Sequence, residues 1–210
     1  MLKILIADDH PIVRKGLRQI LSEESDIGEV GEAQNSQEVL ELVRKKSWDI
    51  VVLDITMPGR GGLDVLKELK ELHPKLPILI LSMHPEDQYA VRALKAGASG
   101  YMTKESAQDE LVKAIRKILQ GGKYVSPSLA EKLAFNLEVR TEKPPHETLS
   151  DREYQVMLMI ASGKTVSRIA EELALSAKTI DTYRTRILEK MKMKTNAELM
   201  KYAIRNKLVE

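Results

Sequence analysis

Short apolar runs alternate with amphipathic stretches along residues 1–122 of the chain. Runs of about four to eight apolar residues between helical patterns are typical of parallel strands buried on both faces. The alternation predicts an α/β fold with a doubly wound, five-stranded parallel sheet. The expected strands lie near residues 3–7, 29–34, 49–54, 77–82 and 99–102, and the expected helices lie near residues 11–23, 36–46, 62–72, 86–96 and 107–120.

The pattern changes after Gly121-Gly122. A short helix is expected near residues 128–137, and the polar, proline-interrupted residues 140–147 are typical of an exposed linker with a partly extended Pro-Pro pair. An all-α, four-helix domain follows and opens with a capping box, Ser150 with Glu153. Its later helices are expected at Val166–Leu173, Ala177–Met191 and Asn196–Asn206. We therefore predict three segments, residues 1–122, 123–147 and 148–210.

Charge and composition narrow the classes of protein. Residues 1–122 carry a net charge of −2 and residues 148–210 a net charge of +4. The basic part suits a nucleic-acid partner, although chance variation on a charged surface would give the same balance. The chain has no cysteine, which excludes a disulfide framework and a thiolate zinc site. No apolar stretch suits a signal peptide or a membrane span, so we expect a cytoplasmic protein without membrane insertion.

Polar side chains follow four of the expected strands. Asp8 and Asp9 follow the first strand, Asp54 the third, Ser82 the fourth and Lys104 the fifth. Ligands of open parallel sheets bind outside the carboxyl ends of the strands, so these side chains should converge there. Clustered carboxylates need a cation at neutral pH, oxygen ligands suit Mg²⁺, and a lysine suits a phosphoryl oxygen. The pattern predicts a phosphorylatable aspartate with its metal site.

Asp54 is the candidate nucleophile, because a carboxylate can attack a phosphoryl group and form an aspartyl phosphate. We expect Asp9 and Asp54 to bind Mg²⁺ directly and Asp8 to bind it through water, with the carbonyl of Thr56 as a further ligand. Lys104 would neutralise charge on the transferring group.

Ser82 and Tyr101 are candidates for a switch. Ser82 could hydrogen-bond a phosphoryl oxygen after modification, and Tyr101, one strand away, could move as that contact forms. A simpler interpretation remains open for each aspartate alone, since aspartates after strands often cap helices and the pair before His10-Pro11 could do so. The occurrence of all these residues at the strand ends of one sheet favours a site.

Residues 166–191 have the pattern of a helix-turn-helix, two helices joined by a short turn. The second helix has an apolar stripe of Ile180, Ile187, Leu188 and Met191, with Tyr183 at its edge. Its opposite face could contact phosphates and base edges of double-stranded DNA, or could simply be solvated. The candidate DNA contacts are Thr165, Arg168, Lys178, Thr179, Asp181, Thr182, Thr185, Arg186 and Lys190.

Residues 1–122 resemble the receiver domain of two-component response regulators, which has a flavodoxin-like fold. The matching motifs are Asp8-Asp9, the stretch from Leu53 to Gly62, Leu81-Ser82, Ala96-Gly97-Ala98 and Tyr101-Met-Thr-Lys104. The resemblance implies phosphotransfer from a sensor histidine kinase to Asp54. It also implies that Asp8 and Asp9 serve magnesium, that Ser82 and Tyr101 form the switch pair, and that Lys104 contacts the phosphoryl group.

Residues 149–180 resemble the LuxR-type DNA-binding domain, so that the whole chain is similar to NarL/FixJ-type response regulators. Residues 156–160 and 182–184 are similar to those of the GacA/UvrY-like subgroup. Asp181 and Tyr183 depart from the lysine and histidine that are usual in the family. An acidic group near the groove weakens general phosphate attraction and should narrow the base preference.

These features predict a phosphorylation-activated DNA-binding transcription regulator rather than an enzyme. A phosphatase or mutase with an aspartyl nucleophile needs a second carboxylate two residues later, where this chain has Thr56. Two further classes of protein stay open, a DNA-binding protein whose receiver no longer takes phosphate and a receiver that binds proteins without a DNA target. Activation is expected to loosen an inhibitory contact with the DNA-binding part, to promote a homodimer, or to do both. The homodimer could form through the helices near 11–23 and 107–120 or through the helix near 128–137.

Overall fold

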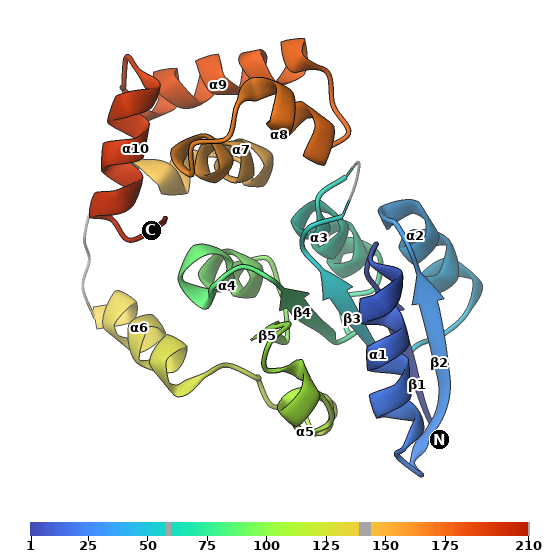
Figure 1. Ribbon diagram of the computed structural model, residues 1–210. Helices are drawn as coiled ribbons and strands as arrows, with labels where there is room; N and C mark the ends of the chain where they lie inside the picture. Colours follow the sequence, from blue (N-terminus) through green and yellow to red (C-terminus); the bar gives the residue numbers. More distant parts are fainter. Residues whose placement is uncertain (58–59, 139–143, 210) are drawn as a thin grey trace. The chain divides into compact units, whose positions relative to one another are not determined.

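A computed structural model describes residues 1–57, 60–138 and 144–209. The chain divides into two compact units, Met1–Leu137 and Glu138–Glu210, and we describe each unit by itself (Figure 1). The linker predicted over residues 140–147 lies partly outside the described residues, because residues 139–143 are not among them.

The first unit contains five parallel strands in the order β2-β1-β3-β4-β5. They are β1 (Leu2–Ala7), β2 (Ile27–Ala33), β3 (Ile50–Asp54), β4 (Ile78–Ser82) and β5 (Gly100–Thr103). The predicted doubly wound sheet is confirmed. Strand ends differ from the expected ones by one or two residues, because pairing with a neighbour sets them. Ile27, for example, pairs with Leu2, which starts β2 earlier than the apolar pattern indicates.

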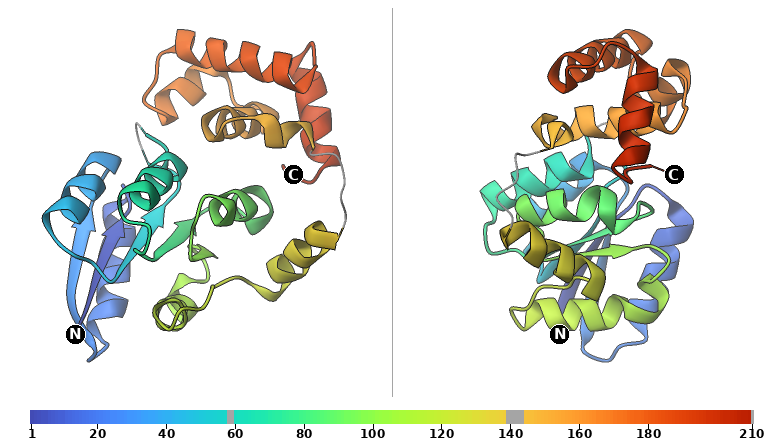
Figure 2. Two further views of the ribbon diagram at one scale, coloured as in Figure 1. Left: turned by 180° about the vertical axis from the view of Figure 1, so that it is seen from behind. Right: turned by 90° about the vertical axis from the view of Figure 1, so that its left-hand side faces the viewer.

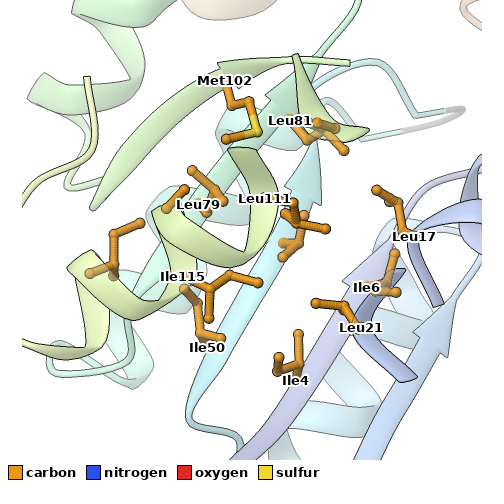
Figure 3. Packing of buried hydrophobic residues seen from close by; sticks show 14 residues of the cluster. Ile4, Ile6, Leu17, Leu21, Ile50, Leu79, Leu81, Met102, Leu111 and Ile115 are labelled. Carbon is orange, nitrogen blue, oxygen red and sulfur yellow. The ribbon is translucent and has the colours of Figure 1, made fainter. Parts of the chain in front are cut away.

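Helices cover both faces of this sheet (Figures 1 and 2). They are α1 (Pro11–Ser22), α2 (Ser36–Lys45), α3 (Gly62–Leu72), α4 (Glu86–Lys95) and α5 (Ala107–Leu119). A further helix, α6 (Pro127–Glu138), follows them in the chain. Apolar residues of α1 and α5 pack on one face of β1, β3, β4 and β5, and Figure 3 shows Leu17, Leu21, Leu111 and Ile115 there. Burial of these residues fixes the strands whose carboxyl ends bear the predicted site.

The chain after α5 returns to the edge of the sheet, which the apolar pattern does not predict. Tyr124 pairs in parallel with Gly100 of β5. Tyr101 N–H donates to the Tyr124 carbonyl at 3.0 Å, and Tyr124 N–H donates to the Ser99 carbonyl at 3.0 Å. A single extended residue thus covers the edge of β5, and α6 begins three residues later.

The second unit is helical and begins with a 3-10 helix, η1 (Pro145–Thr148). Its α-helices are α7 (Asp151–Ala161), α8 (Val166–Glu172), α9 (Ala177–Met191) and α10 (Asn196–Arg205). The predicted all-α domain is therefore confirmed. Each helix starts at a hydroxyl-bearing N-cap whose oxygen accepts a backbone N–H, and these caps are Ser150, Thr165, Ser176 and Thr195.

Of the predicted exposed linker, residues 144, 145 and 147 are exposed, and residues 145–147 lie within η1. Pro145 begins η1, where a proline's fixed φ suits a first helical position. His146 then packs into the second unit, with Nδ1 2.7 Å from the Tyr202 hydroxyl of α10 and its ring 6.0 Å from that of Tyr154 in α7. These tertiary contacts order a segment that has no periodic apolar pattern.

Candidate functional site

The predicted acidic residues meet where β1 and β3 end. Asp8 follows β1 and Asp54 is the last residue of β3, and each is only 1% exposed. This is where the strand order changes direction, between β1 and β3, the position at which doubly wound sheets bind their ligands. Ligand oxygens or nitrogens of Asp8, Asp9, His10 and Asp54 all lie within 4.8 Å of one another.

Lys104 completes this cluster from the end of β5. Its Nζ lies 2.7 Å from Asp54 Oδ2 and 2.6 Å from Asp8 Oδ2, and its side chain is 7% exposed. The Lys104 N–H donates to the Ser82 carbonyl of β4 at 2.8 Å, which fixes the backbone from which this side chain extends. A buried ammonium between two buried carboxylates partly neutralises their repulsion.

Burial dominates the electrostatics of Asp54 and raises the pKa of its carboxyl to about 6. Lys104 and the N–H of Thr56, 2.9 Å from Asp54 Oδ1, oppose this rise, and the charge of Asp8 adds to it. Burial alone would lower the pKa of Lys104, but Asp54 and Asp8 outweigh it and raise that pKa. Lys104 therefore stays charged, while Asp54 remains basic enough to act as a nucleophile.

The donor set suits a hard divalent cation. Asp8 Oδ2, Asp9 Oδ1 and Thr56 Oγ1 are buried and have no hydrogen bond of good geometry within the described ranges of the chain. The first two still have close polar neighbours. Lys104 Nζ lies 2.6 Å from Asp8 Oδ2, and the ring nitrogen Nδ1 of His10 lies 2.8 Å from Asp9 Oδ1. Such incompletely satisfied carboxylate oxygens are the ligands that Mg²⁺ prefers. The cluster thus fits the predicted cation.

Ser82 and Tyr101 are both buried and are linked through one residue, His84. The His84 N–H donates to Ser82 Oγ at 3.0 Å, and the Tyr101 hydroxyl donates to the His84 carbonyl at 2.8 Å. Both residues of the predicted switch pair are therefore hydrogen-bonded to the segment between β4 and α4. The side chain of Tyr101 points into the protein in this state.

The sequence interpretation missed His10 and Arg14. His10 Nδ1 lies 3.1 Å from Asp8 Oδ1 and 2.8 Å from Asp9 Oδ1. Its proximity to two aspartates in the sequence could have indicated this contact. His10 is also the N-cap of α1 but makes no side-chain cap bond, and Asp8 Oδ1 accepts its N–H at 2.8 Å. Helix capping by the two aspartates therefore does not describe this turn.

The candidate DNA-binding residues lie on α8, α9 and their N-caps. All are exposed except Thr179, which is half-buried. The stripe predicted to face inward is buried at Ile180, Ile187 and Met191, whereas Leu188 and Tyr183 are half-buried. The structure therefore presents a polar face of α9 to solvent, as a recognition helix requires.

Several of these polar groups are already engaged within the unit. Lys190 Nζ lies 2.6 Å from Glu153 Oε2, and Arg168 contacts Glu171 and Glu172 at 3.1 and 3.0 Å. Asp181 pairs with Arg184 at 3.3 Å. The candidate hydroxyls are engaged as well. Thr182 donates to the Lys178 carbonyl, Thr185 donates to the Asp181 carbonyl, Thr179 Oγ1 lies 2.8 Å from Ser176 Oγ, and Thr165 accepts the Arg168 N–H.

Two of the candidate cations differ from the others in this respect. Lys178 and Arg186 have no ion pair among the residues described for this unit, and both are exposed. A cation without an internal carboxylate partner keeps its full attraction for phosphate. Lys178 and Arg186 are therefore the strongest candidates for contacts to the DNA backbone or to guanine.

A parallel sheet with an acidic cluster at its carboxyl edge, together with a helix-turn-helix unit, defines the class of two-component response regulators. The chain belongs to this family: the model of the response regulator receiver domain matches residues 4–116, and that of bacterial regulatory proteins of the luxR family matches residues 147–203. None of the described helices is both long enough and apolar enough to span a membrane.

Similar proteins agree with this assignment over the full length. The chain is 37% identical to the response regulator GacA of Pseudomonas aeruginosa over 100% of this chain and 99% of that protein. It is 36% identical to the response regulator UvrY of Escherichia coli K12, over 99% and 96% of the two chains. A structure of RcsB from Salmonella enterica serovar Typhimurium, bound to promoter rprA with the phosphomimetic BeF₃⁻, has a TM-score of 0.65 at 28% identity and covers 96% and 98% of the chains.

Proposed function

We propose that this response regulator is a transcription factor whose Asp54 accepts a phosphoryl group from a sensor histidine kinase. The observation that supports this best is the buried Asp54 carboxylate at the end of β3, with Lys104 2.7 Å away and Asp8 and Asp9 beside it. No small-molecule turnover is part of the proposal. The functional segments are residues 1–122, a linker over 123–147, and the DNA-binding residues 148–210, in a cytoplasmic protein.

In the proposed reaction, a carboxylate oxygen of Asp54 forms a bond to phosphorus as the bond from phosphorus to the donor histidine breaks. Asp8, Asp9, Asp54 and the Thr56 carbonyl would hold Mg²⁺, which supplies charge neutralisation for the transferring group. Lys104 contacts Asp54 Oδ2 and would pair with a phosphoryl oxygen on that carboxylate.

The phosphoryl group would then act on the switch pair. The Ser82 hydroxyl accepts the His84 N–H in this structure and would donate its O–H to a phosphoryl oxygen. Its movement towards that oxygen would shift the segment that also binds the Tyr101 hydroxyl. This local change in hydrogen bonding biases a two-state element, as in other phosphorylation switches. The altered receiver surface is proposed to form a homodimer that binds two DNA half-sites.

DNA contact is assigned to the exposed face of the helix-turn-helix. Lys178 and Arg186 would pair with phosphates or guanine, and Asp181 could accept from cytosine. Thr165 and Thr179, at the starts of α8 and α9, would contact backbone phosphates. Arg168, Thr182, Thr185 and Lys190 would exchange their present internal contacts for DNA contacts.

The test is the intact mass of the protein after incubation with acetyl phosphate, with and without Mg²⁺. Wild type should gain the mass of one phosphoryl group only with Mg²⁺, and Asp54→Asn should gain none. Asp64→Asn, an aspartate in the first turn of α3, is the matched control and should behave as wild type. The same gain in Asp54→Asn would assign the phosphoryl group to another residue.

A further inference from the structure

Arg14 of α1 is a buried cation on an otherwise apolar face. It shares a helical stripe with Leu17 and Leu21, which face the sheet, and only 6% of it is exposed. Its Nη1 donates to the backbone carbonyl of Asp8 at 2.7 Å, and its Nε donates to Glu32 Oε2 of β2 at 3.4 Å. An arginine is rarely buried unless its planar guanidinium has fixed partners, so the geometry of this side chain is defined by both contacts.

The carbonyl that Arg14 binds belongs to the peptide group between Asp8 and Asp9. β1 ends at Ala7, and the paired residues of β1 with β2 and β3 also end there. The Asp8 N–H donates to the Ala33 carbonyl at 3.1 Å, so Asp8 is held from β2 on one side and from α1 on the other. Because a peptide unit is planar, rotation of this one would displace both carboxylates together.

Glu32, the carboxylate that pairs with Arg14, reduces the repulsion between the guanidinium and a bound cation. A lone guanidinium next to a cluster of carboxylates would repel a divalent cation bound there. Glu32 offsets part of that charge through its contact with Arg14, and it also pairs with Arg18 Nη1, 2.9 Å from Oε1. The side chain of Arg18 is 61% exposed, and in the described part of the chain it has no bond to the Asp8 carbonyl.

We propose that Arg14 is a positioning residue for the divalent-cation site. Arg14 holds the peptide group between Asp8 and Asp9 so that both carboxylates face the position where the cation would bind. The proposal rests on the metal site of the proposed function and extends it to a residue that touches neither cation nor phosphoryl group. Residues that orient ligands from outside the ligand shell typically change metal affinity by an order of magnitude or more.

The test is direct titration with Mn²⁺, followed by the electron paramagnetic resonance signal of the free ion, on full-length protein. Arg14→Met should weaken Mn²⁺ binding about tenfold. Arg14→Lys, with a single ammonium that cannot serve both partners, should fall between this variant and wild type. Arg18→Met, which loses only the Glu32 contact, should bind as wild type.

A second measurement separates positioning from general damage. The Mg²⁺ concentration at half-maximal phosphoryl uptake should rise in Arg14→Met, while uptake at saturating Mg²⁺ returns close to that of wild type. Unfolding in urea shows whether each variant is folded. If Arg14→Met is unfolded, the Mn²⁺ affinity of Arg14→Lys tests the proposal instead.

Equal Mn²⁺ affinity of wild type and the folded Arg14 variants would overturn the proposal, as would an equal loss in Arg18→Met. If wild type itself bound no Mn²⁺ and took up no phosphoryl group, the proposed function would fail, and the role of Arg14 with it. Wild-type binding and uptake with unaffected Arg14 variants would reject the role of Arg14 alone.

Discussion

Single residues of the acidic cluster could be predicted because charged side chains stand at the carboxyl ends of apolar strand patterns in the sequence. Asp8 and Lys104 each follow a strand and Asp54 ends one, so a parallel sheet brings their side chains to the same edge. Arg14 could not be found this way, since its importance comes from a backbone carbonyl that no side-chain pattern shows. Its one signal in the sequence is a charged residue on the stripe of Leu17 and Leu21.

Lys104 pairs with the carboxylates of Asp8 and Asp54, so we predict that its ammonium group competes with a metal ion for these two carboxylates. Lys104→Met leaves Asp8 and Asp54 uncompensated, so without Mg²⁺ the receiver unit should lose about 3 kcal/mol of unfolding free energy. Added Mg²⁺ should restore most of this loss and stabilise the variant more than wild type, because the same carboxylates then bind the ion. Urea unfolding followed by fluorescence of Trp48, the single tryptophan, measures both effects.

Lys123→Met provides the comparison for this experiment. Lys123 Nζ donates to the Ala98 carbonyl at 2.6 Å and lies in the same unit. Its loss should not change the response to Mg²⁺. Equal stabilisation of wild type and Lys104→Met by Mg²⁺ would show that Lys104 does not occupy the position of the cation.

At the scale of elements, local sequence predicts helix starts well and chain paths between helices poorly. Ser150 forms the predicted capping box with Glu153, since both partners lie in one turn. The bridge from Tyr124 to Gly100 and the 3-10 helix η1 depend on contacts with distant residues. Neither segment has a periodic apolar pattern in the sequence, because the surface that each segment covers determines its conformation.

Glu153 also joins two elements, because Lys190 of α9 lies 2.6 Å from it. Burial alone would raise its pKa, but the bonds from Lys190 and Ser150 outweigh burial and lower it below the ordinary 4.5. A depressed folded-state pKa stabilises the unit above the unfolded-state pKa, and this contribution disappears as the pH falls through the folded-state pKa. Glu153→Gln should therefore cost about 1–2 kcal/mol at pH 7 and less below pH about 4.5.

Hydrogen exchange of the α7 amides, measured by mass spectrometry from pH 3 to pH 7, checks this expectation in the full-length protein. Glu198→Gln is the control, because Glu198 occupies the same position after the Thr195 cap of α10 but is exposed. A loss of protection in Glu153→Gln that is equally large at pH 3 and pH 7 would contradict an ionised Glu153 as its source.

At the scale of the whole molecule, the strand that bears Tyr101 is bonded to the chain segment that leaves the receiver. The Tyr101 N–H binds the Tyr124 carbonyl, and Ser126, which precedes α6, binds Glu86 of α4. Tyr101 and α4 are therefore both hydrogen-bonded to the chain segment between α5 and α6. Sequence patterns identify both units but not this connection, which exists only through backbone pairing at a sheet edge.

This connection predicts that phosphorylation changes how two copies bind DNA. A duplex selected by the phosphorylated protein should contain two half-sites, because a symmetric dimer presents two recognition helices. Its affinity should exceed that of a duplex with one half-site about a hundredfold, because the second contact becomes intramolecular. Asp54→Asn treated with acetyl phosphate should show little of this gain, and Arg186→Ala should weaken binding to both duplexes. An equal gain in Asp54→Asn, measured by fluorescence anisotropy at fixed salt, would mean that dimeric binding does not depend on the phosphoryl group.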